Sequence, residues 1–276
     1  MMKRFLLLLC VLFLCLGSAP RKITWLALGD SITYLNDHTN ETGNRITKGY
    51  LTLIKERYPQ VEYINQGHNG WTAVKIAESI ESLGLVKADV YTVFLGTNDW
   101  WQGKRIGSLT DYQQATGNGT IYGSFRTIID KFHSLNKKAR IILITPMQRG
   151  DFVYINNPSN NAYGSYKPKM DQTLEQVVDA LIQIGKSEKL PVVDLYHDSA
   201  LTLENMVRFK RLKNPETGQY QDYTYPAYLN IPFNPKTDDY PYPIESVALT
   251  YDGLHPSDQG YEIITDRLIQ KWKGLK

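Results

Sequence analysis

Cysteine is nearly absent from this sequence of 276 residues. The chain has two cysteines, Cys10 and Cys15, and both lie within its first 17 residues. If that segment is removed after synthesis, the remaining chain can form no disulfide and offers no thiol nucleophile. Covalent catalysis by the mature chain must therefore use a nucleophile other than cysteine.

The sequence also lacks a strong excess of charge. Its formal net charge is +3 at pH 7, and this falls to +1 when Lys3 and Arg4 are removed with the first segment. Basic and acidic residues are interspersed, and no basic stripe stands out. Nucleic-acid binding proteins concentrate positive charge on one face. We therefore expect no nucleic-acid partner.

No apolar run is long enough to span a membrane comfortably. The run "FLLLLCVLFLCL" at residues 5–16 has twelve residues, and the basic residues Lys3 and Arg4 precede it. A transmembrane helix needs about 20 apolar residues, whereas a signal-peptide core needs 7–15. Residues 1–17 are therefore predicted to be a signal peptide, and the protein is expected to be exported to the periplasm, the cell surface or the medium.

The end of the signal peptide allows two outcomes. Cleavage after Gly17 would place the small residues Cys15 and Gly17 at positions −3 and −1, which is the usual pattern. Alternatively, Cys15 is a lipid-attachment site. The sequence "LFLC" lacks the small residue usually found before such a cysteine, so cleavage after Gly17 is favoured. Apart from this possible anchor, no stable membrane insertion is expected.

Several catalytic signatures are missing. There is no H-E-x-x-H motif and no other Asp/His spacing typical of a metal site, so we expect neither a metal nor a cofactor. The G-x-S-x-G elbow of the α/β-hydrolases is also absent. The chain shows no internal repeat, linker or low-complexity tract. Residues 20–276 are therefore expected to form a single domain.

Five short apolar runs rich in β-branched or aromatic residues predict strands. They lie at residues 23–28, 61–65, 90–95, 140–145 and 191–195. Their nearly continuous apolar character is typical of strands that are covered on both faces, as in a parallel sheet.

Helical spacing of apolar residues falls between and after these runs. It is clearest from Met170 to Ile184 within residues 168–186, and again from Tyr261 to Trp272. Weaker helical patterns occupy residues 48–58, 72–82 and 120–135. Strands that alternate with helices predict a doubly wound α/β fold in one domain.

The loops that leave the predicted strands are long. They span residues 29–47, 96–119 and 146–167, whereas the links from each helix into the next strand are short. Long loops inside a compact domain are usually functional. In open α/β sheets, ligands bind at the carboxyl ends of the strands. The site is therefore expected at that edge.

Ser31 follows the first predicted strand in the stretch "LALGDSITY". A serine hydroxyl is a poor nucleophile at neutral pH and needs a base, usually a histidine oriented by a carboxylate. Two histidines have an aspartate three residues upstream: His197 after Asp194, and His255 after Asp252. The second pair is favoured, because the glycine and proline in "DGLHP" predict a tight turn before the last helix. The simpler alternative is a helix cap beside a surface histidine.

Two further loops could supply oxyanion-hole donors. "NQGHNGWT" at residues 65–72 contains Gly67 and Gly70, whose backbone N–H groups no side chain would obstruct. "FLGTNDWW" at residues 94–101 contains Asn98, whose amide is a donor. Each loop alone is equally consistent with ordinary turn chemistry. Their shared position at the edge that carries Ser31 favours a functional reading.

Together these stretches resemble the SGNH, or GDSL-type, hydrolases. The resemblance rests on four blocks in the family's order: "GDS" (29–31), "NQGHNG" (65–70), "GTND" (96–99) and "DGLHP" (252–256). It implies a flavodoxin-like, three-layer α/β/α sandwich with a five-stranded parallel sheet. By the same resemblance, Ser31 is the nucleophile, His255 the base and Asp252 its orienter. The N–H groups of Ser31 and Gly70 and the amide of Asn98 would form the oxyanion hole.

The substrate is less strongly indicated. Trp100 and Trp101 follow Asn98 and could wall the pocket, or one of the two could belong to the core. Residues 205–250 contain six tyrosines and six prolines, and tyrosine faces suit sugar rings. The same segment could instead pack on its own aromatic residues. The loops have few large aliphatic residues, which disfavours a groove for long acyl chains.

We therefore expect an exported esterase that removes short acyl groups, such as acetyl, from a carbohydrate, so that its partner is a small-molecule or glycan ester. The alternatives are a lysophospholipase, thioesterase or general carboxylesterase, and a glycan-binding module without turnover. Asp37, His38 and His68 flank the four blocks, and the sequence leaves their roles open.

Overall fold

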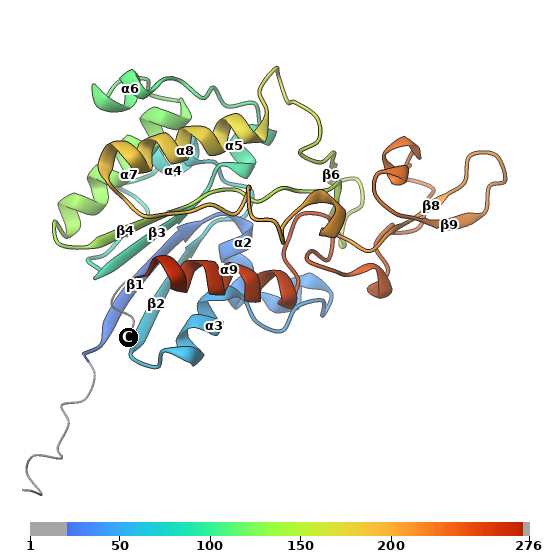
Figure 1. Ribbon diagram of the computed structural model, residues 1–276, viewed down its shortest axis with the longest axis horizontal. Coiled ribbons are helices and arrows are strands. Elements are labelled where there is room, and N and C mark those ends of the chain that lie inside the picture. Colours follow the sequence, from blue (N-terminus) through green and yellow to red (C-terminus); the bar gives the residue numbers. More distant parts are fainter. Residues whose placement is uncertain (1–20, 273–276) are drawn as a thin grey trace, which may run out of the picture.

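A five-stranded sheet forms the centre of the molecule (Figure 1). In the computed structural model, which describes residues 21–272, the strand order is β2-β1-β3-β4-β7 and every pairing is parallel. The strands are β1 (Ile23–Gly29), β2 (Val61–Gly67), β3 (Val90–Phe94), β4 (Arg140–Ile144) and β7 (Val192–Val193). All five predicted strands are confirmed. The signal-peptide prediction, including Cys10 and Cys15, lies outside the described residues.

Helices cover both faces of this sheet. On one face lie α3 (Tyr50–Arg57) and α9 (Asp258–Lys271); on the other lie α4 (Ala73–Glu78), α7 (Ile121–Leu135) and α8 (Leu174–Glu188) (Figure 1). Three short helices follow strands or join helices: α2 (Ser31–Tyr34), α5 (Thr97–Trp101) and α6 (Leu109–Gln113). The arrangement is the three-layer α/β/α sandwich that the sequence predicted.

The sheet separates two hydrophobic cores. Along β1, Trp25 and Ala27 point into the core beneath α3 and α9, while Leu26 and Leu28 point into the core beneath α4, α7 and α8. All four side chains are fully buried. This explains why the strand reads as one continuous apolar run.

The start of α8 differs from the prediction. The helix begins at Leu174 rather than at residue 168, and Met170, which was expected on its apolar face, is 71% exposed. Thr173 caps the helix: its side chain accepts from the Gln176 N–H, and the Gln176 side chain accepts from the Thr173 N–H. This capping box satisfies first-turn donors and fixes the start of the helix. Met170 lies before it, with φ at +47°.

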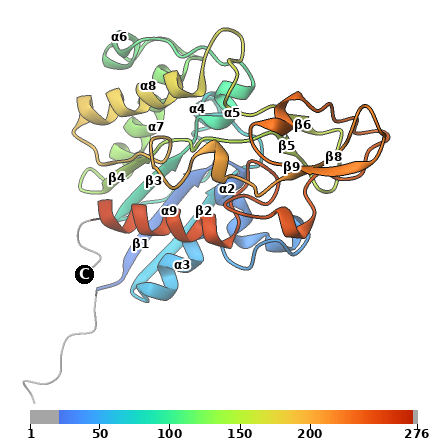
Figure 2. The same ribbon diagram turned by 45° about the vertical axis from the view of Figure 1, so that its right-hand side comes forward.

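The tyrosine-rich segment packs largely on itself. It contains the antiparallel pair β8 (Lys210–Lys213) and β9 (Tyr220–Tyr223), and it lies beyond the carboxyl ends of the sheet strands, near the pair β5 (Phe152–Val153) and β6 (Asn161–Ala162) (Figure 2). Tyr228 and Tyr242 are buried in a separate cluster with Val153, Val207 and Leu212. Of the two readings left open by the sequence, the self-packed one fits the structure.

Within residues 21–272, no helix is both long and apolar enough to cross a bilayer. The same part of the chain holds no group of three or more His, Cys, Asp or Glu side chains arranged to bind a metal ion.

Candidate active site

Ser31 is placed by the turn between β1 and α2. It is the first residue of α2, and the Asp30 side chain before it accepts a hydrogen bond from the Ile32 N–H at 3.0 Å. The first N–H groups of a helix have no intrahelical partner. The Ser31 N–H is such a group, at the residue that carries the candidate nucleophile.

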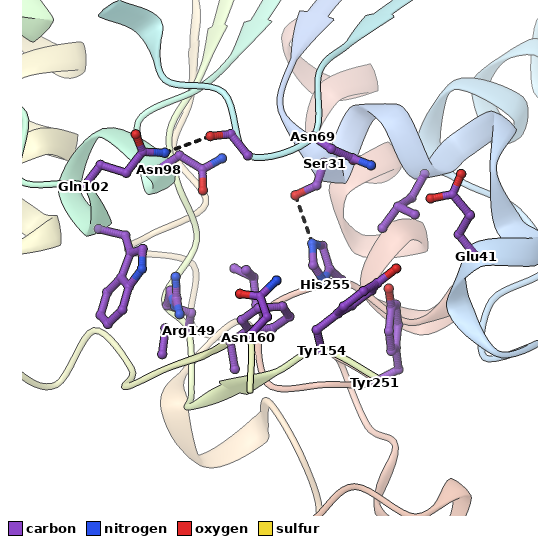
Figure 3. Close-up of a pocket in the computed structure, with 16 residues that line it drawn as sticks. Ser31, Glu41, Asn69, Asn98, Gln102, Arg149, Tyr154, Asn160, Tyr251 and His255 are labelled. Carbon is purple, nitrogen blue, oxygen red and sulfur yellow. Dashed lines mark hydrogen bonds between the residues drawn. The ribbon is translucent and has the colours of Figure 1, made fainter. Parts of the chain in front are cut away.

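A continuous chain of hydrogen bonds links Ser31, His255 and Asp252. Ser31 Oγ lies 2.9 Å from His255 Nε2 (Figure 3), and His255 Nδ1 lies 2.7 Å from Asp252 Oδ2. The second Asp252 oxygen accepts from the N–H groups of Leu254 and His255 at 3.0 and 2.7 Å. Asp252 is fully buried. Because its two oxygens bond to different groups, this one side chain fixes both the turn and the imidazole.

Two aromatic rings hold the imidazole in place. Tyr251 stacks on His255 with centroids 5.8 Å apart, and Phe152 meets it edge-on at 5.4 Å. His255 is 7% exposed. Packing from two sides and the bond to Asp252 restrict the ring to an orientation that points Nε2 at Ser31.

The expected oxyanion donors lie around the same pocket. Gly70 has φ at +72°, a conformation that favours glycine, and its carbonyl accepts from Gln102 Nε2 at 2.8 Å. The Asn98 amide donates to the Trp71 carbonyl at 3.1 Å and lies 3.4 Å from Asp30 Oδ2. Ser31, Gly70 and Asn98 all line the pocket. The structure therefore brings every predicted donor to one place.

A buried carboxylate ties two of these loops together. Asp99 accepts from the N–H groups of Ala73 and Val74 at 2.8 and 3.3 Å, which joins α5 to the start of α4. Burial raises the pKa of Asp99 to about 6, although the backbone donors act in the opposite direction. Burial also raises the pKa of Asp30 to about 6, against the lowering effects of the Ile32 N–H and of His255.

The sequence model of the GDSL-like lipase/acylhydrolase family matches residues 27–263. The chain belongs to this family. Its members are ester-hydrolysing lipases and esterases, so the chain is a carboxylic ester hydrolase.

Solved structures agree with this GDSL-like assignment. A protein from Chitinophaga pinensis described as "a possible lipase" is 62% identical, with a TM-score of 0.89 over 90% of this chain and 97% of that one. A Lactobacillus plantarum protein is 19% identical, with a TM-score of 0.61 over 91% and 97% of the two chains. An acetyl xylan esterase is 20% identical, with a TM-score of 0.53 over 90% and 98%. The last two show the fold alone. No curated protein matches the chain.

The pocket of this GDSL-like hydrolase has a volume of about 480 Å³. Its walls combine four aromatic rings and four side-chain amides with few aliphatic groups: Trp101, Phe152, Tyr154 and Tyr251; Asn69, Asn98, Gln102 and Asn160; and Leu35, Ala162 and Leu254. Ser31 and His255 lie between Arg149 and Glu41, and these four residues and Gly70 complete the lining (Figure 3).

One of the two predicted tryptophans belongs to the core instead. Trp101 lines the pocket, but Trp100 is fully buried and its Nε1 donates to the Gln172 carbonyl at 2.9 Å. Successive residues of α5 face different sides, so only one of the two indoles reaches the pocket. The prediction that Trp100 walls the pocket is wrong.

The other flanking residues have structural contacts outside the pocket lining. Asp37 accepts from the Tyr63 hydroxyl at 2.9 Å, His38 stacks on Tyr34, and His68 stacks on Trp71. These contacts hold the loops after β1 and β2.

Asp194 and His197, the less favoured Asp/His pair of the sequence, form a separate contact away from Ser31. His197 Nδ1 lies 2.8 Å from Asp194 Oδ2, and its Nε2 lies 3.6 Å from Glu175, on an exposed surface. It is His255, not His197, that reaches Ser31.

The sequence alone did not identify the opposite wall of the pocket. Arg149, Tyr154 and Asn160 come from the loop after β4, and Tyr251 precedes the predicted Asp252. The unusual length of the 146–167 loop was the available signal, but length gives no information on which side chains face inward.

Proposed function

We propose that this hydrolase is an exported serine esterase that removes short acyl groups, acetyl foremost, from a carbohydrate. Ser31 is the nucleophile, His255 the general base and Asp252 its orienting carboxylate. The observation that carries the proposal is the unbroken hydrogen-bond chain, at 2.9 and 2.7 Å, that ends at the base of an open pocket. A nucleophile, base and orienter in contact are the signature of activated serine.

The reaction follows from this arrangement. His255 Nε2 accepts the Ser31 proton as Oγ attacks the ester carbonyl, and Asp252 stabilises the resulting imidazolium. The tetrahedral oxyanion accepts hydrogen bonds from the N–H groups of Ser31 and Gly70 and from the Asn98 amide. His255 then gives its proton to the leaving alcohol. Water, deprotonated by His255, hydrolyses the acyl-enzyme.

The pocket lining supports a sugar as the alcohol. Aromatic faces such as those of Trp101 and Tyr154 stack on sugar rings, and the amides of Gln102 and Asn160 can pair with hydroxyls. A long acyl chain would need a continuous aliphatic wall, and Leu35, Ala162 and Leu254 are too few to form one.

A second candidate is an esterase for long acyl chains, such as a lysophospholipase, thioesterase or general carboxylesterase. It is favoured by the 62% identical relative described as "a possible lipase". Rates on 4-nitrophenyl acetate and 4-nitrophenyl octanoate separate the two candidates. We expect the acetate to be hydrolysed faster; a preference for octanoate would support the second candidate.

The catalytic proposal is tested by active-site labelling. A fluorophosphonate probe should label the wild-type protein at Ser31 and should label neither Ser31→Ala nor His255→Ala. Acetate release from a panel of acetylated polysaccharides would then identify the sugar. A wild-type protein that is folded but neither labelled nor active on 4-nitrophenyl acetate would instead support a glycan-binding module without turnover.

Export is tested independently of activity. We expect the secreted protein to begin at Ser18, after cleavage behind Gly17. N-terminal sequencing and intact mass measure this. A chain that begins at Cys15 and carries the mass of a lipid would establish the anchored form instead.

A further inference from the structure

Arg149 is a buried cation with free hydrogen-bond donors beside the candidate nucleophile. Its side chain is 1% exposed, and it lines the pocket that contains Ser31 and His255. Neither Nε nor Nη2 has a hydrogen-bond partner among the described residues. A buried polar group without a partner destabilises the fold, and a charged one does so strongly. Such a group therefore calls for an explanation in function.

The carboxylates near Arg149 are all engaged elsewhere. Asp252 holds His255, and Asp30 accepts from the Ile32 N–H. Asp151 accepts from Lys210 Nζ at 2.9 Å. These three charges act on Arg149 at longer range. Burial lowers the pKa of Arg149 to about 10, which these carboxylates oppose, so it stays protonated at neutral pH. Its charge is balanced from a distance, while its Nε and Nη2 stay buried and unpaired.

A second cation contacts the same indole ring as Arg149. The Arg149 guanidinium is 5.4 Å from the centre of the Trp101 ring, and Lys169 Nζ is 4.0 Å from the centre of that ring. Neither cation forms an ion pair in the described part of the chain. Glu41, the acidic residue of the lining, lies on the far side of Ser31 and His255 (Figure 3). Within the lining, the positive charge of Arg149 and the negative charge of Glu41 therefore lie on opposite sides of the nucleophile and its base.

We propose that Arg149 binds a carboxylate of the substrate, so that the preferred esters are those of an acidic sugar. This inference rests on the proposed esterase function. A planar carboxylate can accept two parallel N–H bonds from a guanidinium, which would satisfy the donors that the fold leaves unpaired. A neutral ester would leave them unpaired and bind less well.

The test compares matched substrates. One is an acetylated galacturonic acid oligosaccharide, and the other is the same compound with its carboxyl groups methyl-esterified. We expect the wild-type kcat/KM to be about 10- to 100-fold higher for the free acid, the usual size of a charge-assisted hydrogen bond. A second comparison, of the rates on mono-4-nitrophenyl glutarate and 4-nitrophenyl acetate, tests whether the enzyme instead binds a carboxylate in the acyl half of the ester.

Variants assign the preference to one residue. Arg149→Met should reduce the acid-to-methyl-ester ratio to about one, and Arg149→Lys should keep part of it. The control is Arg211→Gln, which removes a cation paired with Asp222 on the β8–β9 hairpin and should keep the full ratio. A folded Arg149→Met variant that keeps the wild-type ratio would overturn the proposal. Thermal unfolding establishes that each variant is folded.

A wild-type measurement keeps the test decisive if Arg149→Met does not fold. Galacturonic acid should inhibit 4-nitrophenyl acetate hydrolysis at least about 10-fold more strongly than its methyl ester does. Equal inhibition, together with equal rates on all paired substrates, would overturn the role of Arg149 and leave the esterase intact. If the folded wild-type protein shows no Ser31-dependent hydrolysis of 4-nitrophenyl acetate, the proposed esterase function itself is overturned.

Discussion

Asp252 accepts three hydrogen bonds at the site, and each has a functional consequence. One oxygen holds the imidazole of His255, and the other holds the turn that delivers it. Asp252→Asn would keep the shape but offer His255 Nδ1 an N–H or a weaker acceptor, which favours the wrong tautomer. We expect kcat on 4-nitrophenyl acetate to fall by about 10³- to 10⁴-fold.

The chain supplies a matched control for this substitution. Asp194 also lies three residues before a histidine and bonds to its Nδ1, but at an exposed site away from Ser31. Asp194→Asn should leave kcat unchanged. Equal losses in the two variants would show that the Asp252 effect is not catalytic.

Two glycines near the site predict contrasting outcomes for the same change. Gly70 has φ at +72°, and an added Cβ would meet no atom within 4 Å. Gly70→Ala should therefore cost only the backbone strain, about 1–2 kcal/mol of unfolding free energy. Gly253 has φ at +87°, and its Cβ would lie 1.8 Å from the Asp151 carbonyl oxygen. Gly253→Ala should unfold at a much lower denaturant concentration. Similar urea midpoints for both would contradict this account.

At the residue scale, the sequence predicted the site residues that lie in short motifs. Ser31, Gly70, Asn98 and the Asp252/His255 turn each lie within a few residues of the end of a strand or the start of a helix, so local pattern placed them at one edge. Arg149 could not be found this way. Its burial depends on the path of a long loop, which tertiary contacts determine.

At the scale of elements, buried strands were easier to predict than helix starts. The continuous apolar runs of β1, β3 and β4 predict strands directly, because both faces of the sheet are covered. The start of α8 was missed because Met170 extends the helical spacing by chance, although the capping box at Thr173 is present in the sequence. Here local capping outweighs periodicity.

Asp99 makes the contact between α5 and α4 sensitive to pH. Its pKa rises from 3.8 to about 6 in the folded protein. Between these values the folded chain binds more protons at Asp99 than the unfolded chain does, so the stability contributed by this group falls as pH rises from about 4 to 6. Asp99→Asn removes the titration, at a fixed cost from the weaker acceptor.

We therefore expect the stability of Asp99→Asn, relative to wild type, to increase by up to about 3 kcal/mol between pH 4 and pH 7. Urea unfolding at several pH values measures this difference directly. Wild-type and variant curves that stay parallel across the range would show that folding does not shift the pKa of Asp99.

At the scale of the whole molecule, the sandwich provides a rigid edge and the long loops build the pocket on it. The sequence predicted the edge, since parallel strands bring their carboxyl ends together. It could not predict how residues 205–250 fold, because that segment has little periodic pattern. Its structure depends on a few buried contacts to the pocket wall, of which Lys210 to Asp151 is the most polar.

That ion pair predicts how the outer segment supports the site. Lys210 is 3% exposed, and Asp151 also accepts from the Gly164 N–H and the Tyr166 hydroxyl, in the loop that carries Tyr154 and Asn160. Lys210→Met would leave the Asp151 carboxylate, which is 17% exposed, without its cation, and we expect it to cost up to about 3 kcal/mol of unfolding free energy.

The double variant Lys210→Met/Asp151→Asn should recover part of this loss, because no isolated charge remains. Arg211 is the control: it lies on the same strand and pairs with Asp222, and the side chains of this pair are 42% and 43% exposed. Arg211→Met should cost less than about 1 kcal/mol. Urea unfolding of the three variants measures these costs. If the Lys210 and Arg211 substitutions cost the same, the Lys210–Asp151 pair does not anchor the segment, and the pocket wall must be held by the tyrosine cluster around Tyr228 and Tyr242.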